Sequence, residues 1–311
     1  MKNTNLLFGL AILALTSCEH KDLCYDHAHT FDVCVFFDWR NAPEADPETM
    51  SAYLFPENDE QAQRYEYPNK TGGSAAIPAN NYLALCLNTD TEVNLLRNTD
   101  DADTFEIYTR EAKTMKNLGT AMSSLPRAED TETEIVVLTP EMIWSDRIDN
   151  ITVACNAGNR TIVFHPSERL CTYTVEIRNV KNLQYASSMS GLLSGMGGSM
   201  LLAQRQLIGE RCTLPFDVTR DGIDCVKGQF NTFGHCPVTV GKHQMTVYVI
   251  LTDNTKWYYT WDVTEQIHLA ADQCQIDIVL DGLELPEPED VGGGFHPDVD
   301  DWKNIQIEIT M

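Results

Sequence analysis

The feature of this sequence that most limits its fold is a series of short apolar segments separated by turn-forming residues. Glycine, proline, asparagine and aspartate recur between the segments along most of the chain. No segment alternates with a long amphipathic helical pattern, which argues against a parallel α/β sheet. Many short strands with frequent turns are typical of β-sandwiches. We therefore predict an all-β chain.

The segments fall into two groups, on either side of a change in composition between Ser123 and Asp146. There, a Leu-Pro-Arg triplet is followed by the acidic run 129–132. We predict one β-sandwich over residues 31–140 and a second over residues 148–285. The strands predicted for the first are 31–37, 51–55, 63–67, 82–88, 105–109 and 134–138. Those predicted for the second are 150–155, 160–165, 171–179, 212–218, 223–230, 244–252, 256–263 and 275–280.

Two segments of the second group have special features. Asp253-Asn254 is a turn-forming pair, and it predicts a hairpin between residues 245–251 and 256–261. Residues 187–203 are rich in serine, glycine, methionine and leucine, which is compatible with a helix or an apolar loop. We predict a loop that covers the edge of the second sandwich.

The first residues have the pattern of a lipoprotein signal peptide. Lys2 precedes an uncharged apolar run of about 10 residues, which is too short for the roughly 20 of a membrane-spanning helix. Leu15, Thr16, Ser17 and Cys18 match the bacterial lipobox. We expect residues 1–17 to be removed, Cys18 to carry acyl chains such as palmitate, and residues 18–30 to form a tether. An ordinary secretory signal before a cysteine is the alternative.

The charge of the chain limits its partners. The net charge is -24 with only 22 basic residues, which argues against binding to nucleic acid or to anionic lipid by charge. Such a surface suits a location outside the cell. We predict a protein that is tethered to a membrane by lipid and exposed at the cell surface.

Besides Cys18 the chain has nine cysteines, an odd number, and several lie within strand-like apolar runs. A free cysteine in such a run behaves as a small buried hydrophobe. We expect most of them to be reduced. The best candidate disulfide joins Cys225 to Cys236, which flank a possible hairpin, although connectivity cannot be deduced from sequence.

Two kinds of candidate metal ligand occur. Cys24, His27, His29 and Cys34 are close in sequence, but their spacing fits no common zinc framework. Two acidic loops lack the glycine and glutamate of a calcium-binding loop, and these are Asn98, Asp100, Asp101 and Asp103, and Asp298, Asp300 and Asp301. We predict no metal and no cofactor. No common nucleophile, zinc-protease or phosphate-binding motif is present, so we also predict no enzyme activity.

The C-terminal residues 286–311 have an unusual order. An acidic, proline-containing spacer is followed by Gly292-Gly293-Gly294, and then by a strand in which Ile305, Ile307 and Ile309 alternate with polar residues. Such a strand needs a sheet edge to pair with. It is a candidate donor strand for another molecule, an edge strand of its own sandwich, or disordered.

Several local motifs carry a family resemblance. They are Cys18-Glu19-His20-Lys21 with Leu23-Cys24, Phe37-Asp38-Trp39-Arg40-Asn41-Ala42-Pro43, Tyr53-Leu54-Phe55-Pro56, Asn88-Thr89-Asp90-Thr91-Glu92, and the ending from Trp302 to Ile309. Together they resemble the fimbrillin-like outer-membrane lipoproteins of Bacteroidota, which are largely a domain of unknown function. The resemblance extends over essentially the whole mature chain.

The resemblance implies two tandem transthyretin-like, Greek-key β-sandwich domains and, through wider kinship with fimbrillins, assembly by donor-strand exchange. In those systems a trypsin-like protease cuts after an arginine in the N-terminal arm. This chain has no arginine between Cys18 and its first strand. A fimbrial (pilus) anchor or accessory subunit therefore fits better than a main stalk subunit, with other pilus subunits as partners.

The alternative to a pilus role is a surface glycan-binding lipoprotein. Five tryptophans could line a sugar platform, and they are Trp39, Trp144, Trp257, Trp261 and Trp302. Trp257 and Trp261 lie on one strand face at period two, which favours a place in the core or an interface.

Overall fold

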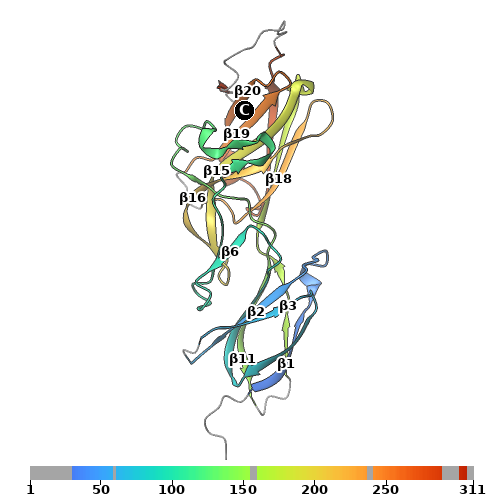
Figure 1. The fold of residues 1–311 in the computed structure, drawn as a ribbon, viewed down its shortest axis with the longest axis vertical. Coiled ribbons are helices and arrows are strands. Elements are labelled where there is room, and N and C mark those ends of the chain that lie inside the picture. Colours follow the sequence, from blue (N-terminus) through green and yellow to red (C-terminus); the bar gives the residue numbers. More distant parts are fainter. Residues whose placement is uncertain (1–29, 59–60, 155–159, 237–240, 289–300, 307–311) are drawn as a thin grey trace, which may run out of the picture.

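The computed structural model describes residues 30–58, 61–154, 160–236, 241–288 and 301–306. Nearly all regular structure in these residues is β-strand, arranged in an elongated body with two halves (Figure 1). The predicted all-β fold is confirmed. The signal peptide, Leu15, Thr16, Ser17, Cys18 and residues 19–29 of the tether lie outside the described residues. Within the described part of the chain, no helix is both long and apolar enough to cross a membrane.

The first half is a sandwich of two sheets. One sheet contains, in spatial order, β12 (Thr161–Phe164), β1 (Thr30–Phe37) and β4 (Gly72–Pro78). The other contains β13 (Ser167–Glu168), β11 (Trp144–Val153), β5 (Asn80–Asn88), β2 (Met50–Pro56) and β3 (Gln63–Tyr67). β1 runs parallel to β12 and antiparallel to β4.

Alternate side chains of β1 fill the space between these two sheets. Val33, Val35 and Phe37 are buried, as the two-residue period of a strand requires. Phe37 packs edge-on against Tyr67 and stacks on Phe164, with ring centroids 5.5 and 5.7 Å apart. Just after β1, the 3-10 turn η1 (Trp39–Asn41) follows the strand.

The second half also has two sheets. The larger contains, in spatial order, β10 (Ile135–Val136), β16 (Gln206–Asp217), β15 (Ala186–Leu201), β19 (Gln244–Leu251), β20 (Lys256–Asp262) and β22 (Trp302–Gln306). Two more strands extend this sheet: β7 (Glu106–Thr109) pairs with β15, and β6 (Asn94–Arg97) pairs with β7. The smaller contains β17 (Thr219–Arg220), β18 (Val226–Thr232), β14 (Cys171–Lys181) and β21 (Gln275–Glu284). The remaining elements are the ladder of β8 (Thr114–Met115) with β9 (Thr120–Ala121), the 3-10 turns η2 (Lys116–Leu118), η3 (Met122–Ser124) and η4 (Leu183–Tyr185), and helix α2 (Thr264–His268).

The core of the second half lies between its two sheets. Tyr173 of β14, Val247 of β19, and Tyr259 and Trp261 of β20 belong to one buried cluster. The predicted hairpin is confirmed, because β19 pairs antiparallel with β20. Asn254 in its turn has a φ of 65°, a left-handed conformation that asparagine tolerates.

Strand β15 corrects the prediction of a loop over residues 187–203. It has 16 residues and is buried along most of its length on both faces, so it lacks the alternation that marks a half-exposed strand. Serine and glycine are rare in strands, which is why the segment was taken for a loop. Here they make room for neighbours, because a Cβ on Gly191 would lie 2.1 Å from Cζ of Phe216.

Four strands pair with the opposite half from the one predicted for them. β7 and β10, predicted in the first sandwich, pair with β15 and β16. The segments 150–155 and 160–165, predicted in the second, contribute to β11 and β12, which pair with β5 and β1. The chain therefore crosses between the halves more than once. Alternation and turn residues identify a strand but not its partner, so the composition change at 123–146 did not mark this boundary.

The two halves meet across an apolar junction. Tyr53 and Leu87 of the larger sheet in the first half share a buried cluster with Phe105, Met200 and Leu202. Tyr53 and Phe105 contact edge-on, with ring centroids 4.9 Å apart. β15 extends from the second half into this junction, because its first part pairs with β19 and Met200, near its end, belongs to the junction cluster. A shared apolar core at the junction favours a stiff connection between the halves.

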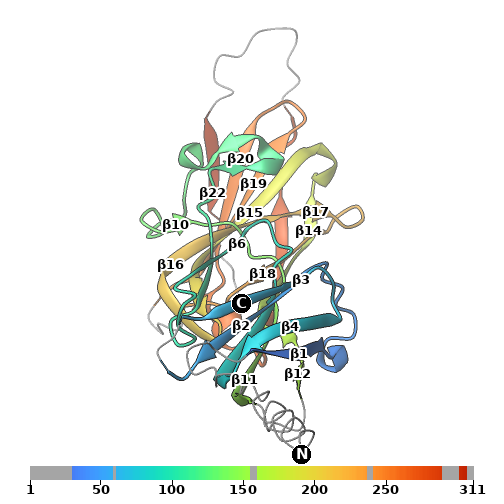
Figure 2. The ribbon, with the colours of Figure 1, turned by 60° about the horizontal axis from the view of Figure 1, so that its bottom comes forward.

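Residues 110–138, here called the strap, lie over the outer face of the larger sheet of the second half (green in Figure 2). The apolar contacts join Ala112, Met115, Leu118, Met122, Leu125 and Val136 of the strap to Leu192 and Tyr248 of the sheet. The Tyr248 hydroxyl also donates to the Pro126 carbonyl oxygen at 2.5 Å. The strap therefore keeps this sheet face from water.

Candidate functional site

The candidate donor strand occupies an edge of its own sheet. β22 lies parallel to β20, in a register that pairs Lys256 with Trp302 and Tyr259 with Ile305. Of the alternatives for this segment, residues 302–306 thus take the one in which the chain completes its own sandwich. The side chain of Ile305, and Ile307 and Ile309 altogether, lie outside the described residues.

Two described side chains fasten β22 to the sheet. Trp302 contacts Tyr248 edge-on, with ring centroids 5.2 Å apart. The Lys303 ammonium lies 5.2 Å from the ring centroid of Trp257, on the other face of the strand. Trp302 is half-buried, and Lys303 is exposed.

A polar network surrounds the point where β15 leaves β19, here called the β15 bend (Ser194 and Gly195). The Gly195 N–H donates to Oε2 of Glu134 at 2.9 Å, and its carbonyl accepts from Cys236 N at 2.9 Å. The Ser194 carbonyl faces Nδ1 of His243 at 3.1 Å. Backbone groups that have lost a strand partner need such replacements. Gly195 has a φ of +79°, and a Cβ there would meet His243 Nδ1 at 2.5 Å.

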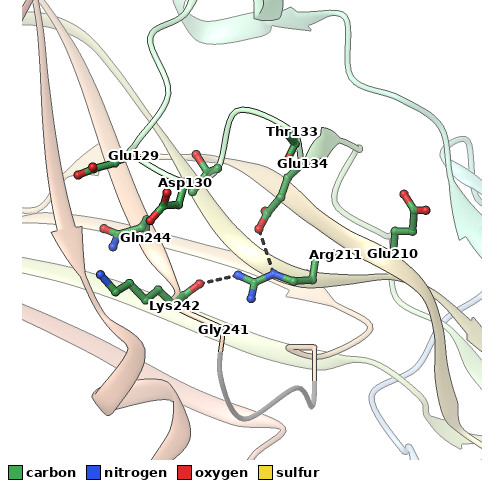
Figure 3. Close-up of a pocket in the computed structure, with 10 residues that line it drawn as sticks. Glu129, Asp130, Thr133, Glu134, Glu210, Arg211, Gly241, Lys242 and Gln244 are labelled. Carbon is green, nitrogen blue, oxygen red and sulfur yellow. Dashed lines mark hydrogen bonds and ion pairs between the residues drawn. The ribbon is translucent and has the colours of Figure 1, made fainter.

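An open hollow of about 670 Å³ lies beside the bend (Figure 3). Its lining residues are Glu129, Asp130, Thr131, Thr133, Glu134, Glu210, Arg211, Gly241, Lys242 and Gln244. Arg211 Nε donates to Glu134 Oε1 at 3.1 Å, and its Nη2 donates to the Lys242 carbonyl at 2.6 Å. Thr213 Oγ donates to the other oxygen of Glu134 at 2.8 Å. The central carboxylate and guanidinium thus bind each other and tie the strap to β15 and β16.

We expect Glu134→Ala to lower the free energy of unfolding by about 2–4 kcal/mol, because it leaves a half-buried guanidinium and the Gly195 N–H without their acceptor. Urea unfolding followed by circular dichroism measures the change. Glu129→Ala is the matched control in the same hollow, since Glu129 is exposed, and it is expected to change stability by less than about 0.5 kcal/mol. Equal effects of the two variants would contradict the anchoring role of Glu134.

Three histidines that the sequence analysis did not single out gather on the other side of the bend. Their ring centroids are 5.6 Å (His235 to His243), 5.7 Å (His235 to His268) and 5.0 Å (His243 to His268) apart. Nε2 of His243 lies 3.1 Å from Nε2 of His268, and Nδ1 of His235 lies 3.0 Å from the Tyr173 hydroxyl. The three histidines come from two separate loops and helix α2, so their spacing in the sequence does not indicate that they form a cluster.

The structure corrects the disulfide prediction. Cys225 and Cys236 are free thiols, whereas Cys171 and Cys274 form a disulfide. β18, with seven residues, separates Cys225 from Cys236 and spans roughly 20 Å, whereas bridged cysteines have Cα atoms within about 7 Å. The remaining described cysteines, Cys34, Cys86 and Cys212, are free, in agreement with the prediction that most are reduced.

The candidate metal ligands do not come together in the described residues. Cys24, His27 and His29 lie outside them, and Cys34 faces Ser74 at 3.8 Å. In the acidic loop, Asp101 Oδ1 accepts from Asp103 N at 2.9 Å, which is the bond of a polar turn. Throughout the described ranges, no three histidine, cysteine, aspartate or glutamate side chains are arranged to hold a metal ion.

The five tryptophans do not form one platform. Trp261 is 2 % exposed, and Trp257 packs against the same core. Trp39 and Trp144 meet edge-on at 6.3 Å in the first half, with the Trp39 indole N–H donating to the Lys70 carbonyl at 2.7 Å. Trp302 lies under the strap edge of the second half. The predicted placement of Trp257 and Trp261 in a core is confirmed, and no observation favours the glycan-binding alternative.

Comparisons with known proteins place the chain among proteins of similar fold. The family model described as "Domain of unknown function (DUF5119)" matches residues 17–217. No curated protein matches the chain.

Among solved structures, a candidate adhesin from Bacteroides ovatus ATCC 8483 is similar, with a TM-score of 0.61 and 19% identity over 88% of this chain and 99% of that one. A candidate adhesin from Bacteroides thetaiotaomicron VPI-5482 has a TM-score of 0.51 and 8% identity over 83% of this chain and 93% of that one. The fimbrial anchor protein Mfa2 from Porphyromonas gingivalis has a TM-score of 0.47 and 12% identity over 81% and 91% of the two chains. At these identities the first two likenesses establish the fold, and the third carries no argument.

Proposed function

Since this chain belongs to the DUF5119 family, whose function is unknown, we propose its role from its own structure: a cell-surface, adhesin-like protein. In finer terms, it is a lipid-anchored pilus anchor or accessory subunit without catalytic activity, held at the outer membrane through Cys18. It joins other pilus subunits by β-strand addition.

The observation that carries this proposal is the position of β22. It is the last described strand and follows a long connection from Leu285, and among the described strands it pairs only with β20. Exchange of such an edge strand would uncover the backbone of β20 beside Trp257, Tyr258 and Tyr259. Once released, β22 is free to add to an open sheet edge of another chain, so β22 is the donor in the proposed strand addition.

Three further observations support this role. The Cys171–Cys274 disulfide suits a protein exported to an oxidising compartment. The fold that this chain shares with two candidate adhesins of Bacteroides is compatible with the same role. The apolar junction between the halves suits a subunit that must keep its shape between a membrane tether and a partner.

A reversible lock on β22 tests strand addition. Tyr258 and Asn304 are paired across β20 and β22, so Tyr258→Cys with Asn304→Cys places two thiols at neighbouring backbone positions. We expect the oxidised double variant to fold but to lose co-purification with pilus subunits by at least tenfold, and to regain it when the engineered bond is reduced. Each single variant is the matched control and should keep its partners.

Removing residues 302–311 is the complementary variant. The two sandwiches should remain folded by circular dichroism, because β22 contributes only edge contacts, while the partner is lost. Strand addition through β22 is excluded if both the locked and the shortened protein bind pilus subunits as the unaltered protein does. Binding to a glycan array in that case would favour the alternative role.

A further inference from the structure

We propose that His235, His243 and His268 make the β15 bend a proton-sensitive joint, which opens when the cluster takes up protons while the first half stays folded. The observation behind it is the position of the cluster. Ser194, which accepts from His243, is the residue at which β15 stops pairing with β19. Beyond the bend, the same strand continues into the apolar junction between the halves.

The hydrogen bonds of the closed bend are complete when His243 is neutral and carries its proton on Nδ1. The Ser194 carbonyl can only accept, so Nδ1 of His243 carries the proton that faces it at 3.1 Å. Nε2 of His243 is then an acceptor, and Nε2 of His268 donates to it at 3.1 Å. A proton added at Nε2 of His243 places two N–H groups against each other unless His268 changes tautomer.

The surroundings disfavour a positive charge at this point. His243 is 1 % exposed, and the hydrogen bonds of its ring are to protein groups. The titratable groups around the cluster come from several elements. Tyr173 of β14 contacts His235, and Arg211 of β16 lies near His243. Glu134 of the strap is bonded to Gly195 and Arg211, and Cys236 and Lys242 adjoin His235 and His243 in the chain. The Glu134 carboxylate is already bound to Arg211, so it does not neutralise an added imidazolium.

The pKa directions agree with this geometry. Burial lowers the pKa of His243 to about 4, helped by the neighbouring His235, His268 and Arg211 and opposed by the bond to Ser194. Burial, and then His268, lowers the pKa of His235 as well. In the open bend, exposed to water, His243 would regain an ordinary pKa of about 6.5. Protonation therefore favours opening, and the effect grows as the pH falls from about 6.5 toward 4.

Opening at this point separates the part of β15 that pairs with β19 from the part that reaches the junction cluster. The amides of Gly195, Cys236 and Gln244 would lose the acceptors that they have in the closed bend. The sandwich core of the first half contains none of the three histidines, so its strands should stay protected. The result is a change in the connection between the halves rather than unfolding of the whole chain.

Amide hydrogen exchange of the full mature chain, with a metal chelator present and corrected for intrinsic rates, tests this joint. We expect protection of Gly195, Cys236 and Gln244 to fall about twentyfold between pH 7 and pH 5, from the difference between the two pKa values of His243. Protection of Cys34, which donates to the Arg160 carbonyl in the first half, should stay within about twofold. No loss at the bend, or an equal loss in both halves, would overturn the proposal.

A matched pair of variants tests whether protonation of His243 causes the loss of amide protection at the bend. In His243→Asn the side-chain amide can still donate to the Ser194 carbonyl but cannot be protonated, so the loss of protection should disappear. His165→Asn, a change in the first half, should behave like the unaltered protein. If His243→Asn fails to fold, the titration of the His243 ring by NMR in the unaltered protein decides: a midpoint below pH 5 supports the joint, and a midpoint near 6.5 overturns it.

Discussion

Replacing Gly191 with valine is expected to prevent the second half from reaching its native fold. Gly191 of β15 lies opposite Phe216 of β16, and a Cβ there would lie 2.1, 2.5 and 2.6 Å from three atoms of the ring. The ring cannot easily move, because it stacks on Phe230 with centroids 4.8 Å apart. Overpacking a core typically costs about 1–3 kcal/mol. Removing a buried phenylalanine ring from its packed position costs about 3–5 kcal/mol. We expect a loss of at least about 4 kcal/mol, measured by urea unfolding.

Two controls distinguish this clash from a general intolerance of added side chains. Gly73→Ala meets only ordinary contacts with Tyr67, at 3.4 Å or more, and should change stability by less than about 1 kcal/mol. If the ring is the obstacle, Gly191→Val with Phe216→Ala should be no less stable than Phe216→Ala alone. A Gly191→Val protein within 1 kcal/mol of the original would show that β15 and β16 do not approach in this way.

The same strand shows which parts of the fold the sequence could predict. β1 and the β19–β20 hairpin were predictable because their signals are local: alternation in the first, and the Asp253-Asn254 turn in the second. β15 was not, since a strand that is buried on both faces and contacts a phenylalanine across glycine has neither alternation nor the usual residue types. The need for glycine at position 191 comes from Phe216, which lies 25 residues further along the chain.

Partners of strands were predicted less well than strands themselves. β11 and β12 look in sequence like any other strands, yet they return to the first half after the chain has already entered the second. The partner of a strand depends on which sheet edges are still free when the other strands have paired. Turn residues do not indicate which edges these are. The large share of contacts between distant segments is the physical reason for this limit.

The candidate sites divide in the same way. The lipobox and the terminal strand can be recognised in the sequence because each is a continuous segment with its own pattern. The partner of the terminal strand, β20, could not be predicted from the sequence. The histidine cluster could not be predicted, because His235, His243 and His268 meet only through the packing of β14, β15 and α2. Glu134 was visible only as one acid in an acidic stretch.

Removing the Cys171–Cys274 disulfide is expected to cost about 3–5 kcal/mol. The bond closes a loop with a sequence separation of 103 residues, and a cross-link of that length removes much of the freedom of the unfolded chain. It also joins the beginnings of β14 and β21, a parallel pair whose register starts at Thr172 and Gln275. Parallel strands need a long connection, so a fixed point at their start favours the correct register. Thermal and urea unfolding of Cys171→Ser with Cys274→Ser measure the loss.

The matched control is Cys225→Ser with Cys236→Ser, which removes the pair that the sequence favoured. Both thiols are free and only half-buried, so we expect a change of less than about 1 kcal/mol. If the control lost as much stability as the Cys171 and Cys274 variant, the cysteines would be paired differently in solution, and β18 could not run extended between Cys225 and Cys236. If only the Cys171 and Cys274 variant is destabilised, the bond holds together two strands of the core that supports the β22 edge.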